Sequence, residues 1–304
     1  MITICIPVYN QRVYPLVNQL DRQIKNSRAQ VDICLIDDAS EQDIRELNRQ
    51  ECGKLARIIE LENNVGRAKI RNLFLKYVES GYLLFLDNDV EIPSTKFIDN
   101  YINAISTEKY AVIVGGHQYQ KQKPAKKYRL RWKYGNKREQ TKAKERNLNP
   151  YKSFMTSNFL ISRNVFNSVQ FNESMTGYGH EDTLFGYELK KHKIKIAHLD
   201  NPVQKKYLDT NDEFLRKTNE GLISLTLLLK ITKYDTDLIS DIKLLNKYDS
   251  LTRSGAIMVF SLVFSVFSGL IKSFLSRGWA ISLFLFDIYK LGTYHRIVKS
   301  RSER

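Results

Sequence analysis

The stretch LLFLDNDVEI, residues 83–92, joins a run of apolar residues to two aspartates and an asparagine. The apolar run is typical of a buried strand, which gains nothing from carboxylates at its end unless they bind something. Asp87, Asn88 and Asp89 therefore mark a candidate ligand site at the end of a strand. A polar surface turn is the alternative interpretation of the same three residues.

The residues around this strand predict an α/β fold. Short β-rich runs alternate with helix-like segments, which is the pattern of βαβ units in a doubly wound, mainly parallel sheet. The strands are apolar throughout, as expected when helices cover both faces of a sheet. The predicted strands are ITICIPV, VDICLID, ARIIEL, YLLFLD and AVIVGG, and the predicted helices run over about 14–26, 41–50, 66–79 and 94–105.

Polar residues follow each of the first four predicted strands. In a doubly wound sheet, ligands bind outside the carboxyl ends of the strands. Each polar group taken alone can be a helix cap or an ordinary turn, but four groups at four successive strand ends favour one binding site. The groups are Pro7, Tyr9 and Asn10; Asp37, Asp38 and Ser40; Asn63, Asn64 and Gly66; and Asp87, Asn88 and Asp89.

The third of these groups also has the features of a phosphate site. Gly66 permits close approach of the backbone to a ligand. Arg67 and Arg71 follow it, and their spacing of four residues places them on one face of a helix near its N-terminus. A helix N-terminus with arginines beside it is favourable for phosphate.

The ordered set IPVYN, LIDDAS, NNVGRAKIRN and LFLDNDVEI resembles the nucleotide-binding half of family 2 glycosyltransferases of the GT-A fold. Two later segments, SNFLISRNVF and FNESMTGYGHEDTLFGYEL, resemble the acceptor-side part of the same superfamily. The resemblance covers roughly residues 1–200. It implies a nucleotide-sugar donor, a divalent metal (Mn²⁺ or Mg²⁺), and transfer of a hexosyl or N-acetylhexosaminyl group to an acceptor hydroxyl.

The resemblance also implies roles for the donor-side residues. Asp87 and Asp89 would form a DXD motif, in which Asp89 ligates the metal while Asp87 faces the ribose or the metal's shell. Oxygen ligands of this kind suit Mg²⁺ and Mn²⁺ beside a diphosphate. Asp38 would accept a hydrogen bond from the ring N–H of the base, which suits uracil and hence a UDP-sugar. The other expected donor-binding residues are Pro7, Tyr9, Asn10, Asn64, Gly66, Arg67, Arg71 and Asn88.

A second pair of acidic residues, Glu181 and Asp182, begins a predicted amphipathic helix. Carboxylates in a first helical turn also interact well with the helix dipole, so capping is the alternative explanation. A sugar hydroxyl must lose a proton to attack, and a carboxylate within hydrogen-bond reach can act as general base. The resemblance implies Asp182 as that base, with Glu181 binding donor or acceptor hydroxyls. One base and in-line attack predict inversion at the anomeric carbon.

Relatives often carry a histidine ligand for the metal after this helix. His192 and His198 are the candidates here, and His198 is the better one, although a core or surface histidine remains the alternative. In the segment NPVQKKYLD, Lys205 and Lys206 stand where such a histidine would be expected. Either the metal has fewer protein ligands or a lysine contacts the diphosphate instead.

The chain is strongly basic. Its 304 residues are 42% hydrophobic and 27% charged, as in folded proteins, and its net charge of +15 favours a polyanionic partner. Residues 119–147 contain twelve Lys or Arg against two Glu, with tyrosines and a tryptophan among them. This segment is a solvated charged helix or loop, a site for single-stranded nucleic acid, or a contact for anionic lipid headgroups or a lipid-diphosphate acceptor. We prefer the lipid interpretation and expect no nucleic-acid partner.

The C-terminal third predicts helices rather than strands. A long amphipathic helix is expected over 211–234 and another around 238–248. The uncharged run GAIMVFSLVFSVFSGLI, residues 255–271, would form a helix of about 25 Å, short for a bilayer core of about 30 Å. Serines on one face and basic flanks favour a monotopic helical pair in the cytoplasmic leaflet. Packing in a helical core or an oligomer contact is the alternative.

These patterns predict a GT-A domain over 1–207 (a nucleotide-sugar half, 1–116, and an acceptor half, 117–207) and a helical extension, 208–304. Three cysteines without metal-ligand spacing predict buried free thiols in a reducing cytoplasm, and no signal peptide is expected. The predicted function is a metal-dependent, inverting glycosyltransferase of surface polysaccharide synthesis, peripheral on the inner face of the cell membrane. The alternative is a basic nucleotide-, membrane- or nucleic-acid-binding protein of the same fold without turnover.

Overall fold

The computed structural model describes the chain except for residues 28, 109, 279–280 and 303–304. The chain divides into two compact units. The first comprises Met1–Tyr119, Gln140–Thr176 and Glu181–Tyr207, and the second comprises Gln120–Glu139, Gly177–His180 and Leu208–Arg304. The sequence prediction of a domain over 1–207 and an extension over 208–304 stays a prediction. The prediction differs in keeping residues 120–139 and 177–180 in the first domain.

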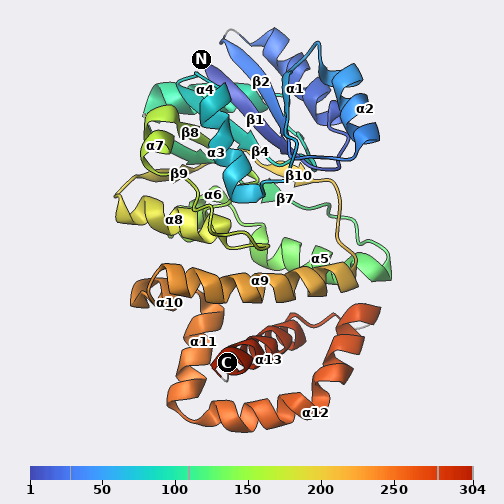
Figure 1. Ribbon diagram of the computed structural model, residues 1–304, viewed down its shortest axis with the longest axis vertical. Helices are drawn as coiled ribbons and strands as arrows, with labels where there is room; N and C mark the ends of the chain where they lie inside the picture. The colour runs from blue at the N-terminus through green and yellow to red at the C-terminus, as the bar shows by residue number, and fades with distance from the viewer. Residues whose placement is uncertain (28, 109, 279–280, 303–304) are drawn as a thin grey trace. The chain divides into compact units, whose positions relative to one another are not determined.

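A seven-stranded sheet forms the centre of the first unit (Figure 1). Its order is β3-β2-β1-β4-β8-β6-β9, in which β8 runs antiparallel to β4 and β6 while the other neighbouring pairs are parallel. The predicted α/β, mainly parallel sheet is confirmed. The strands are β1 (Ile2–Val8), β2 (Val31–Asp37), β3 (Arg57–Glu60), β4 (Tyr82–Leu86), β6 (Val112–Val114), β8 (Asn158–Ser162) and β9 (Ile196–His198).

Helices cover both faces of this sheet, because successive residues of each strand point to opposite faces and nearly all are apolar. Ile4 and Ile6 of β1 join one core cluster and Cys5 joins the other. All three cysteines are buried and free, as predicted. The helices of this unit are α1 (Tyr14–Asn26), α2 (Gln42–Cys52), α3 (Arg67–Tyr77), α4 (Phe97–Glu108), α6 (Ala143–Arg146), α7 (Arg163–Ser168) and α8 (Glu181–Lys191).

A small three-stranded sheet lies in the same unit. Its strands are β5 (Val90–Glu91), β10 (Val203–Lys205) and β7 (His117–Gln118), with β10 in the middle. β10 pairs antiparallel with β5 and parallel with β7. Because β5 directly follows the acidic turn after β4, this pairing brings residues 203–206 beside that turn.

The second unit is helical. Leu130 is fully buried there in a cluster with Phe214, Leu275 and Phe286, which explains why residues 120–139 belong to this unit. The long helix predicted over 211–234 is present as α9, and the one predicted around 238–248 divides into α10 and α11. The elements are η1 (Lys126–Tyr128), α5 (Arg129–Tyr134), the π-helical η2 (Gly135–Glu139), α9 (Asn211–Ile231), α10 (Thr236–Asp241), α11 (Lys243–Arg253), α12 (Ala256–Arg277) and α13 (Leu283–Ser302).

Helix α12 is longer than the uncharged run in the sequence. It continues past Lys272 and ends at Gly278, whose left-handed φ of 66° stops the helix. A Cβ at Gly278 would lie 2.1 Å from the Lys126 carbonyl oxygen, so the position requires glycine. Among the described residues, α12 is the one helix long and apolar enough to cross a membrane, with a mean hydropathy of 1.9 and 17% of its most apolar window buried.

Candidate active site

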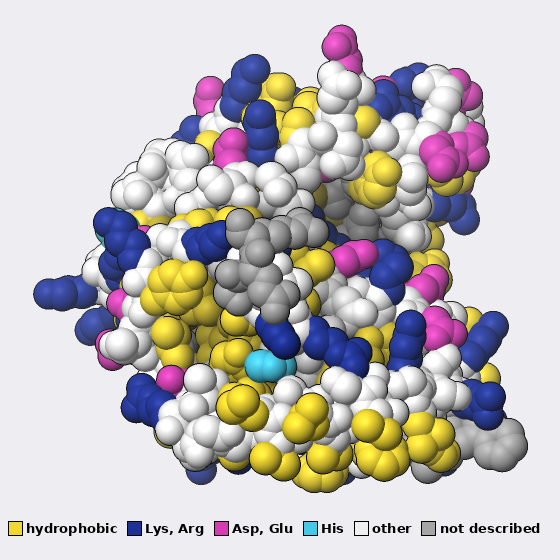
Figure 2. All heavy atoms as spheres, turned by 60° about the horizontal axis from the view of Figure 1, so that its bottom comes forward, with side chains coloured by type: hydrophobic (Ala, Val, Ile, Leu, Met, Phe, Trp, Pro, Cys, Tyr) yellow, Lys and Arg dark blue, Asp and Glu magenta, His cyan; other side chains and the backbone are white. Residues whose placement is uncertain are grey.

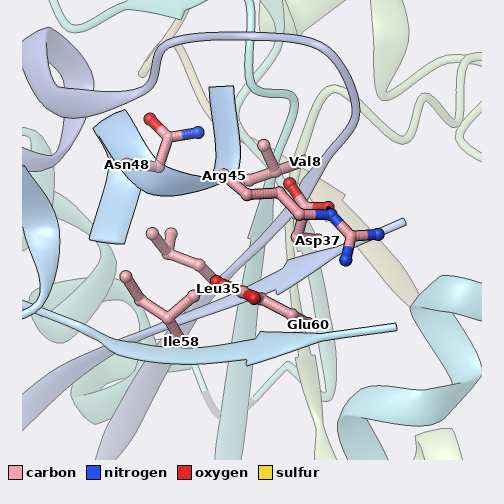
Figure 3. A pocket seen from close by; sticks show the side chains of 7 residues that line it. All are labelled: Val8, Leu35, Asp37, Arg45, Asn48, Ile58 and Glu60. Atoms are coloured by element: carbon pink, nitrogen blue, oxygen red, sulfur yellow. Dashed lines mark ion pairs between the residues drawn. The ribbon is translucent and has the colours of Figure 1, made fainter. Parts of the chain in front are cut away.

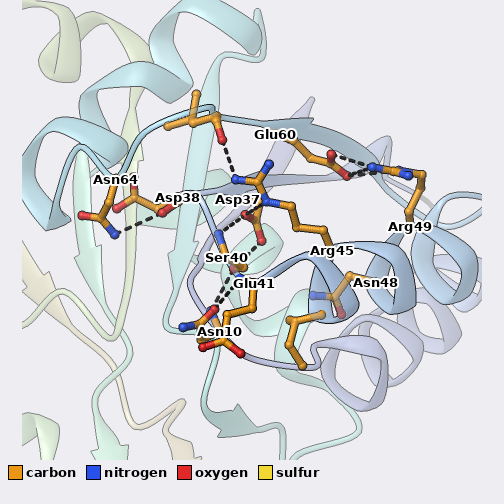
Figure 4. A network of polar contacts seen from close by, with 12 residues as sticks. Asn10, Asp37, Asp38, Ser40, Glu41, Arg45, Asn48, Arg49, Glu60 and Asn64 are labelled. Carbon is orange, nitrogen blue, oxygen red and sulfur yellow. Dashed lines mark hydrogen bonds and ion pairs between the residues drawn. The ribbon is translucent and has the colours of Figure 1, made fainter.

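Asp38 holds the loop that precedes α3, and Figure 4 shows its contact with Asn64 of that loop. The two carboxylate oxygens of Asp38 accept hydrogen bonds from the backbone N–H groups of Val65 at 2.7 Å and Gly66 at 3.1 Å, and Asn64 donates to the Asp38 carbonyl. Gly66 has a φ of 84°, which glycine adopts readily, and α3 begins at the next residue. Burial raises the pKa of Asp38, and the two N–H donors oppose this shift. Each oxygen keeps a further lone pair that a nucleotide base could use.

The ends of β1 and β2 are joined by a polar network (Figure 4). The backbone N–H of Asn10 donates to Ser40 Oγ at 2.8 Å, and the Asn10 side-chain oxygen accepts from the Glu41 N–H at 2.7 Å. Asp37 accepts from the N–H and the hydroxyl of Ser40. Tyr9, which directly follows β1, remains 52% exposed. The polar residues of two strand ends thus form one network, which leaves an exposed aromatic ring beside it.

A small hollow lies between α2 and the β2–β3 edge of the sheet (Figure 3). Within it, Arg45 Nε lies 3.4 Å from Asp37 Oδ1, while another nitrogen of the Arg45 guanidinium donates to the Leu61 carbonyl. The carboxylate of Asp37 is therefore used in contacts within the protein, with Ser40 and Arg45. The hollow is lined by Val8, Leu35, Asp37, Arg45, Asn48, Ile58 and Glu60. It does not include Asp87 or Asp89, so we do not place a diphosphate there.

Asp87 and Asp89 lie in the turn between β4 and β5, and a lysine bridges them. Lys205 Nζ lies 2.8 Å from Asp87 Oδ2 and 3.3 Å from Asp89 Oδ1. Burial tends to raise the pKa of Asp87, but Lys205, Arg71 and Arg67 outweigh burial and hold that pKa well below its usual range. The sequence signal for this contact was a lysine in place of an expected histidine, and it did not reveal that the lysine reaches both carboxylates.

Arg71 joins the acidic turn to the start of α8. Its Nη2 atom lies 3.4 Å from Oδ1 of Asp87. Its Nη1 atom lies 3.8 Å from Oε1 of Glu181. Nη1 also donates to the Arg67 carbonyl, and the guanidinium lies over the ring of Phe171. Among the described residues, Arg71 Nε and Glu181 Oε2 are buried without a hydrogen-bond partner. Unsatisfied buried polar atoms of this kind indicate where ligand groups can bind.

Asp182, the second residue of α8, is half-buried beside this pair. Its Oδ1 accepts a hydrogen bond from the backbone N–H of Thr183 at 2.7 Å. Burial, and next the charge of Glu181, raise the pKa of Asp182 to about 6, while Thr183 and Arg71 oppose the rise. A carboxyl group with such a pKa is ionised at neutral pH and is a stronger base than an ordinary aspartate.

His198 does not lie in this site. Its ring is buried, Nδ1 accepts a hydrogen bond from Arg146 Nε at 3.1 Å, and Nε2 lies 2.9 Å from the Pro150 carbonyl oxygen. Burial lowers the pKa of His198 to about 4, with the Arg146 charge lowering it further, so the ring is neutral. Both ring nitrogens already have protein partners, so the prediction that His198 ligates the metal is wrong. It is a core histidine, as the alternative interpretation had it.

The remaining predicted donor residues lie along the same rim. Pro7 is half-buried near the end of β1, Asn88 is half-buried between the two aspartates, and Arg67 is exposed as the first residue of α3. Together with Asp38 and Arg71, they are contributed by four successive segments of the chain.

The side chains at the acidic turn provide only part of the ligands that a divalent metal needs. Carboxylate oxygens are suitable ligands for Mn²⁺ or Mg²⁺, whose other positions are commonly taken by water and phosphate oxygens. Asp87 and Asp89 supply two such groups, but the part of the chain that the structure describes has no cluster of three or more His, Cys, Asp or Glu that could hold a metal. A cation bound to both carboxylates also requires Lys205 to leave its position between them.

Residues 3–169, more than half of the chain, match the family description "Glycosyl transferase family 2". The chain belongs to glycosyltransferase family 2. Transferase chemistry follows from this membership, and it favours the enzyme over the binding protein without turnover. The sheet rim with Asp38, Arg71, Asp87 and Asp182 is therefore the candidate active site of a glycosyltransferase.

Three comparisons place this glycosyltransferase among known proteins. A teichoic acid poly(glycerol phosphate) polymerase of Staphylococcus epidermidis is 26% identical over 212 residues, which are 66% of this chain and 27% of that protein. The chain thus spans about a quarter of that relative's length. S. aureus TarS 1–349, solved in complex with UDP, is 16% identical with a TM-score of 0.51, and the match covers 98% of this chain and 91% of that one.

The third is the mannosyltransferase PcManGT from Pyrobaculum calidifontis, solved in complex with GDP-Man and Mn²⁺. It is 10% identical with a TM-score of 0.56, and the match covers 98% of this chain and 87% of that one. At these identities the two solved structures show a shared fold.

Proposed function

We propose that this family 2 glycosyltransferase moves a hexosyl or N-acetylhexosaminyl group from a nucleotide-sugar donor to a hydroxyl of a glycan or lipid-linked acceptor, with inversion. One observation carries the proposal. Arg71 lies within ion-pair distance of both Asp87 and Glu181, and Asp182 follows Glu181 directly. A group for the donor's diphosphate and a group for the acceptor's proton therefore lie around one buried guanidinium. A relative named for teichoic acid synthesis supports an acceptor of the surface-polysaccharide type.

On the donor side, the exposed ring of Tyr9 and the neighbouring Pro7 offer an apolar surface for the base. The spare lone pairs of Asp38 can accept a ring N–H, which favours uracil and a UDP-sugar. The diphosphate would lie toward Arg71 and the N-terminus of α3, where Arg67 adds positive charge. Gly66, at the start of this helix, carries no side chain that could obstruct the approach.

A divalent cation, Mn²⁺ or Mg²⁺, held by Asp89 and Asp87 would neutralise the charge that develops on the leaving diphosphate. Arg71 is a second cation at the same place. Its guanidinium is fixed by the Arg67 carbonyl and by the ring of Phe171, so it can stabilise the leaving group without large movement.

On the acceptor side, Asp182 accepts the proton of the attacking hydroxyl. The hydroxyl oxygen forms a bond to the anomeric carbon while the bond from that carbon to the diphosphate oxygen breaks, and the electron pair leaves with the diphosphate. Glu181, with one oxygen toward Arg71 and the other unpartnered, can accept a hydrogen bond from a sugar hydroxyl. A single attack from the side opposite the leaving group inverts the anomeric centre.

The test is incubation with a panel of UDP-sugars and GDP-mannose, with and without Mn²⁺, while release of the free nucleoside diphosphate is followed. We expect slow hydrolysis of one UDP-sugar without acceptor, and faster release when an acceptor fraction is added. Asp182→Asn should reduce the acceptor-dependent part by a factor of roughly 10² or more. Glu188→Gln, which removes one charge from the same helix, is the matched control. Equal rates in wild type and Asp182→Asn would contradict the assignment of the base.

We further propose that the enzyme is peripheral on an anionic membrane surface, in the cytoplasm, and that α12 is its anchor. Residues at the three- and four-residue spacing of one helix face are large, apolar and exposed. Leu262 is 70% exposed and Val266 77% exposed, and the others on or next to this face are Met258, Val259, Val263, Phe267, Leu270 and Phe274. Figure 2 shows a row of exposed hydrophobic side chains at the bottom of the view.

The other sides of α12 are different. Ile257, Phe264 and Leu275 are buried in the second unit, while Ser265 and Lys272 lie on an exposed polar strip between the two apolar faces. A spanning helix would expose apolar residues on all sides that do not contact protein, whereas a helix lying in the interface needs one apolar face and a polar edge. The faces of α12 favour the monotopic arrangement.

The basic segment adds charge to this unit. Its aromatic residues Tyr128, Trp132 and Tyr134 are half-buried, and Tyr134 packs on Phe214 and Phe286, so they do not form an open stacking surface for nucleic acid. Its exposed residues include the basic Lys121, Lys123, Lys126, Lys127, Lys137 and Arg138, beside neutral residues such as Gln120, Gln122 and Ala125. We therefore favour an anionic lipid surface as the partner, where each lysine near the surface contributes about 1 kcal/mol.

Vesicle co-sedimentation tests this proposal. The double variant Leu262→Asp/Val266→Asp should lose binding to anionic vesicles, and the matched variant Ser261→Asp/Ser265→Asp, with the same added charge on the same helix, should lose much less. High salt should weaken wild-type binding without abolishing it, because salt screens charges but not apolar burial. Equal loss in both variants, or a wild-type protein indifferent to vesicles, would overturn the anchor. Deleting the tail is a poor substitute, because Leu275 and Phe286 pack against Phe214.

A further inference from the structure

We infer that Lys205 competes with the divalent cation for Asp87 and Asp89, so that metal enters this site only together with the donor's diphosphate. The inference rests on the proposed function in taking these two aspartates as the metal ligands. Its basis is the position of the ammonium group, 2.8 Å from one carboxylate and 3.3 Å from the other. A cation that binds both carboxylates needs the oxygens that Lys205 now occupies.

The backbone fixes the place of this lysine. Lys205 is opposite Val90 in the antiparallel pair of β10 and β5, and Gln204 is opposite Glu91. The N–H of Lys206 donates to the Asp89 carbonyl at 3.0 Å, so the main chain on both sides of Lys205 is bound beside the acidic turn. The Lys205 side chain is only 15% exposed. Its contact with the two aspartates is therefore built into the sheet and is not an incidental surface ion pair.

The charges around the turn explain the competition. Asp87 and Asp89 carry two negative charges, and Lys205 and Arg71 carry two positive charges within 3.4 Å or less of them. A dication that arrives alone makes this group of charges positive and deprives the ammonium of its partners. A dication that arrives with a diphosphate brings compensating negative charge, and the phosphate oxygens can accept the ammonium's hydrogen bonds.

Lysine has the properties that such an exchange needs. Its ammonium is a compact charge on a flexible four-carbon stem, so it can turn from the carboxylates to a phosphate while its backbone stays paired. Arg71, whose guanidinium is held by the Arg67 carbonyl and lies over Phe171, is less suited to move. We therefore assign the exchange to Lys205 and the fixed charge to Arg71.

Binding of Mn²⁺, followed by the electron paramagnetic resonance signal of the free ion, tests the inference without any turnover. The titration is made with and without UDP for the wild type, Lys205→Met and Lys206→Met. Wild type should bind Mn²⁺ weakly alone and much more tightly with UDP. Lys205→Met should bind Mn²⁺ alone roughly tenfold or more tightly than wild type, and UDP should add less to its affinity. Lys206→Met, which removes the neighbouring charge from above the Tyr207 ring, should behave as wild type.

Two results would overturn the inference. The first is an unchanged affinity of Lys205→Met for Mn²⁺ alone, with circular dichroism showing that the variant is folded. The second is wild-type UDP binding that is indifferent to Mn²⁺ and is lost in Lys205→Met, since the lysine would then replace the metal rather than compete with it. Failure of wild type to bind UDP at all would contradict the proposed function, but the comparison of Mn²⁺ affinities without UDP would still decide the role of Lys205.

Discussion

Nη1 of Arg71 lies 3.8 Å from Oε1 of Glu181, and both side chains are buried. This pair joins the donor-side half of the chain to the helix that carries the proposed base. The same guanidinium lies 3.4 Å from Asp87. A change at Arg71 is therefore expected to affect donor binding and proton transfer together, and this distinguishes it from the other residues of the rim.

Arg71→Met should weaken UDP binding and also shift the pH dependence of turnover. The positive charge of Arg71 lowers the pKa of Asp182, so its removal raises that pKa. The fall of kcat/KM on acidification should then begin at a higher pH than in wild type. Arg71→Lys keeps the charge and serves as the control. A profile that stays in place while UDP binding falls would show that Arg71 does not act on Asp182.

Asp182→Asn should keep nearly full donor affinity and lose a factor of roughly 10² or more in turnover, the scale of general-base catalysis. In wild type the base works only when ionised, and its pKa is about 6, so kcat/KM should fall as the pH drops through about 6. Steady-state rates between pH 5 and pH 8 measure both effects. Turnover like that of wild type would move the base elsewhere, with Glu181 the next candidate.

The same substitution should stabilise the fold at neutral pH. The pKa of Asp182 is about 6 in the folded chain against 3.8 for an ordinary aspartate, so the folded state binds a proton that the unfolded state has already lost. The free energy of unfolding therefore decreases as the pH rises from about 4 to about 6. Above that pH the loss of stability caused by ionising Asp182 in the folded state has reached its full size. Asp182→Asn removes this destabilisation, and we expect a gain of about 3 kcal/mol at pH 8 and none at pH 3. Urea unfolding at the two pH values provides the measurement.

Asp89→Ala should abolish the increase of UDP affinity that Mn²⁺ gives, without unfolding the domain, because Asp89 is 36% exposed at the end of the turn and supports no core packing. Calorimetric titration of UDP with and without Mn²⁺ is the measurement. Asp32→Ala, which removes an exposed aspartate of β2, is the control. If Asp89→Ala responds to Mn²⁺ as wild type does, the metal assignment is wrong.

The rim of the sheet was predictable because its signals are local. A continuous apolar run followed at once by acidic or amide residues is visible in the sequence, and the parallel topology brings such ends together. Asp38, Arg71 and Asp87 could be named in this way. Asp182 depended on the resemblance, because a carboxylate in a first helical turn has an ordinary structural explanation.

The features that the sequence did not predict depend on tertiary contacts. β5, β7 and β10 have only two or three residues each, too few for a periodic pattern, so the position of Lys205 beside Asp87 could not be derived. The strand IAH does not show that His198 would meet Arg146 inside the protein. Leu130 of the basic segment is buried in the helical unit, and nothing in a run of lysines and arginines reveals where its few apolar residues pack.

The place of β10 in the small sheet has a consequence for synthesis of the protein. β10 is the last strand in the part of the chain that the structure describes, and it pairs with β5, which is made much earlier, so this contact has a long sequence separation and a slow loop closure. Until the ribosome has released Lys205, the nascent chain holds Asp87 and Asp89 as two carboxylates without this ammonium partner. A chain stalled shortly before residue 203 should therefore take up free divalent cation at the acidic turn more readily than the finished enzyme.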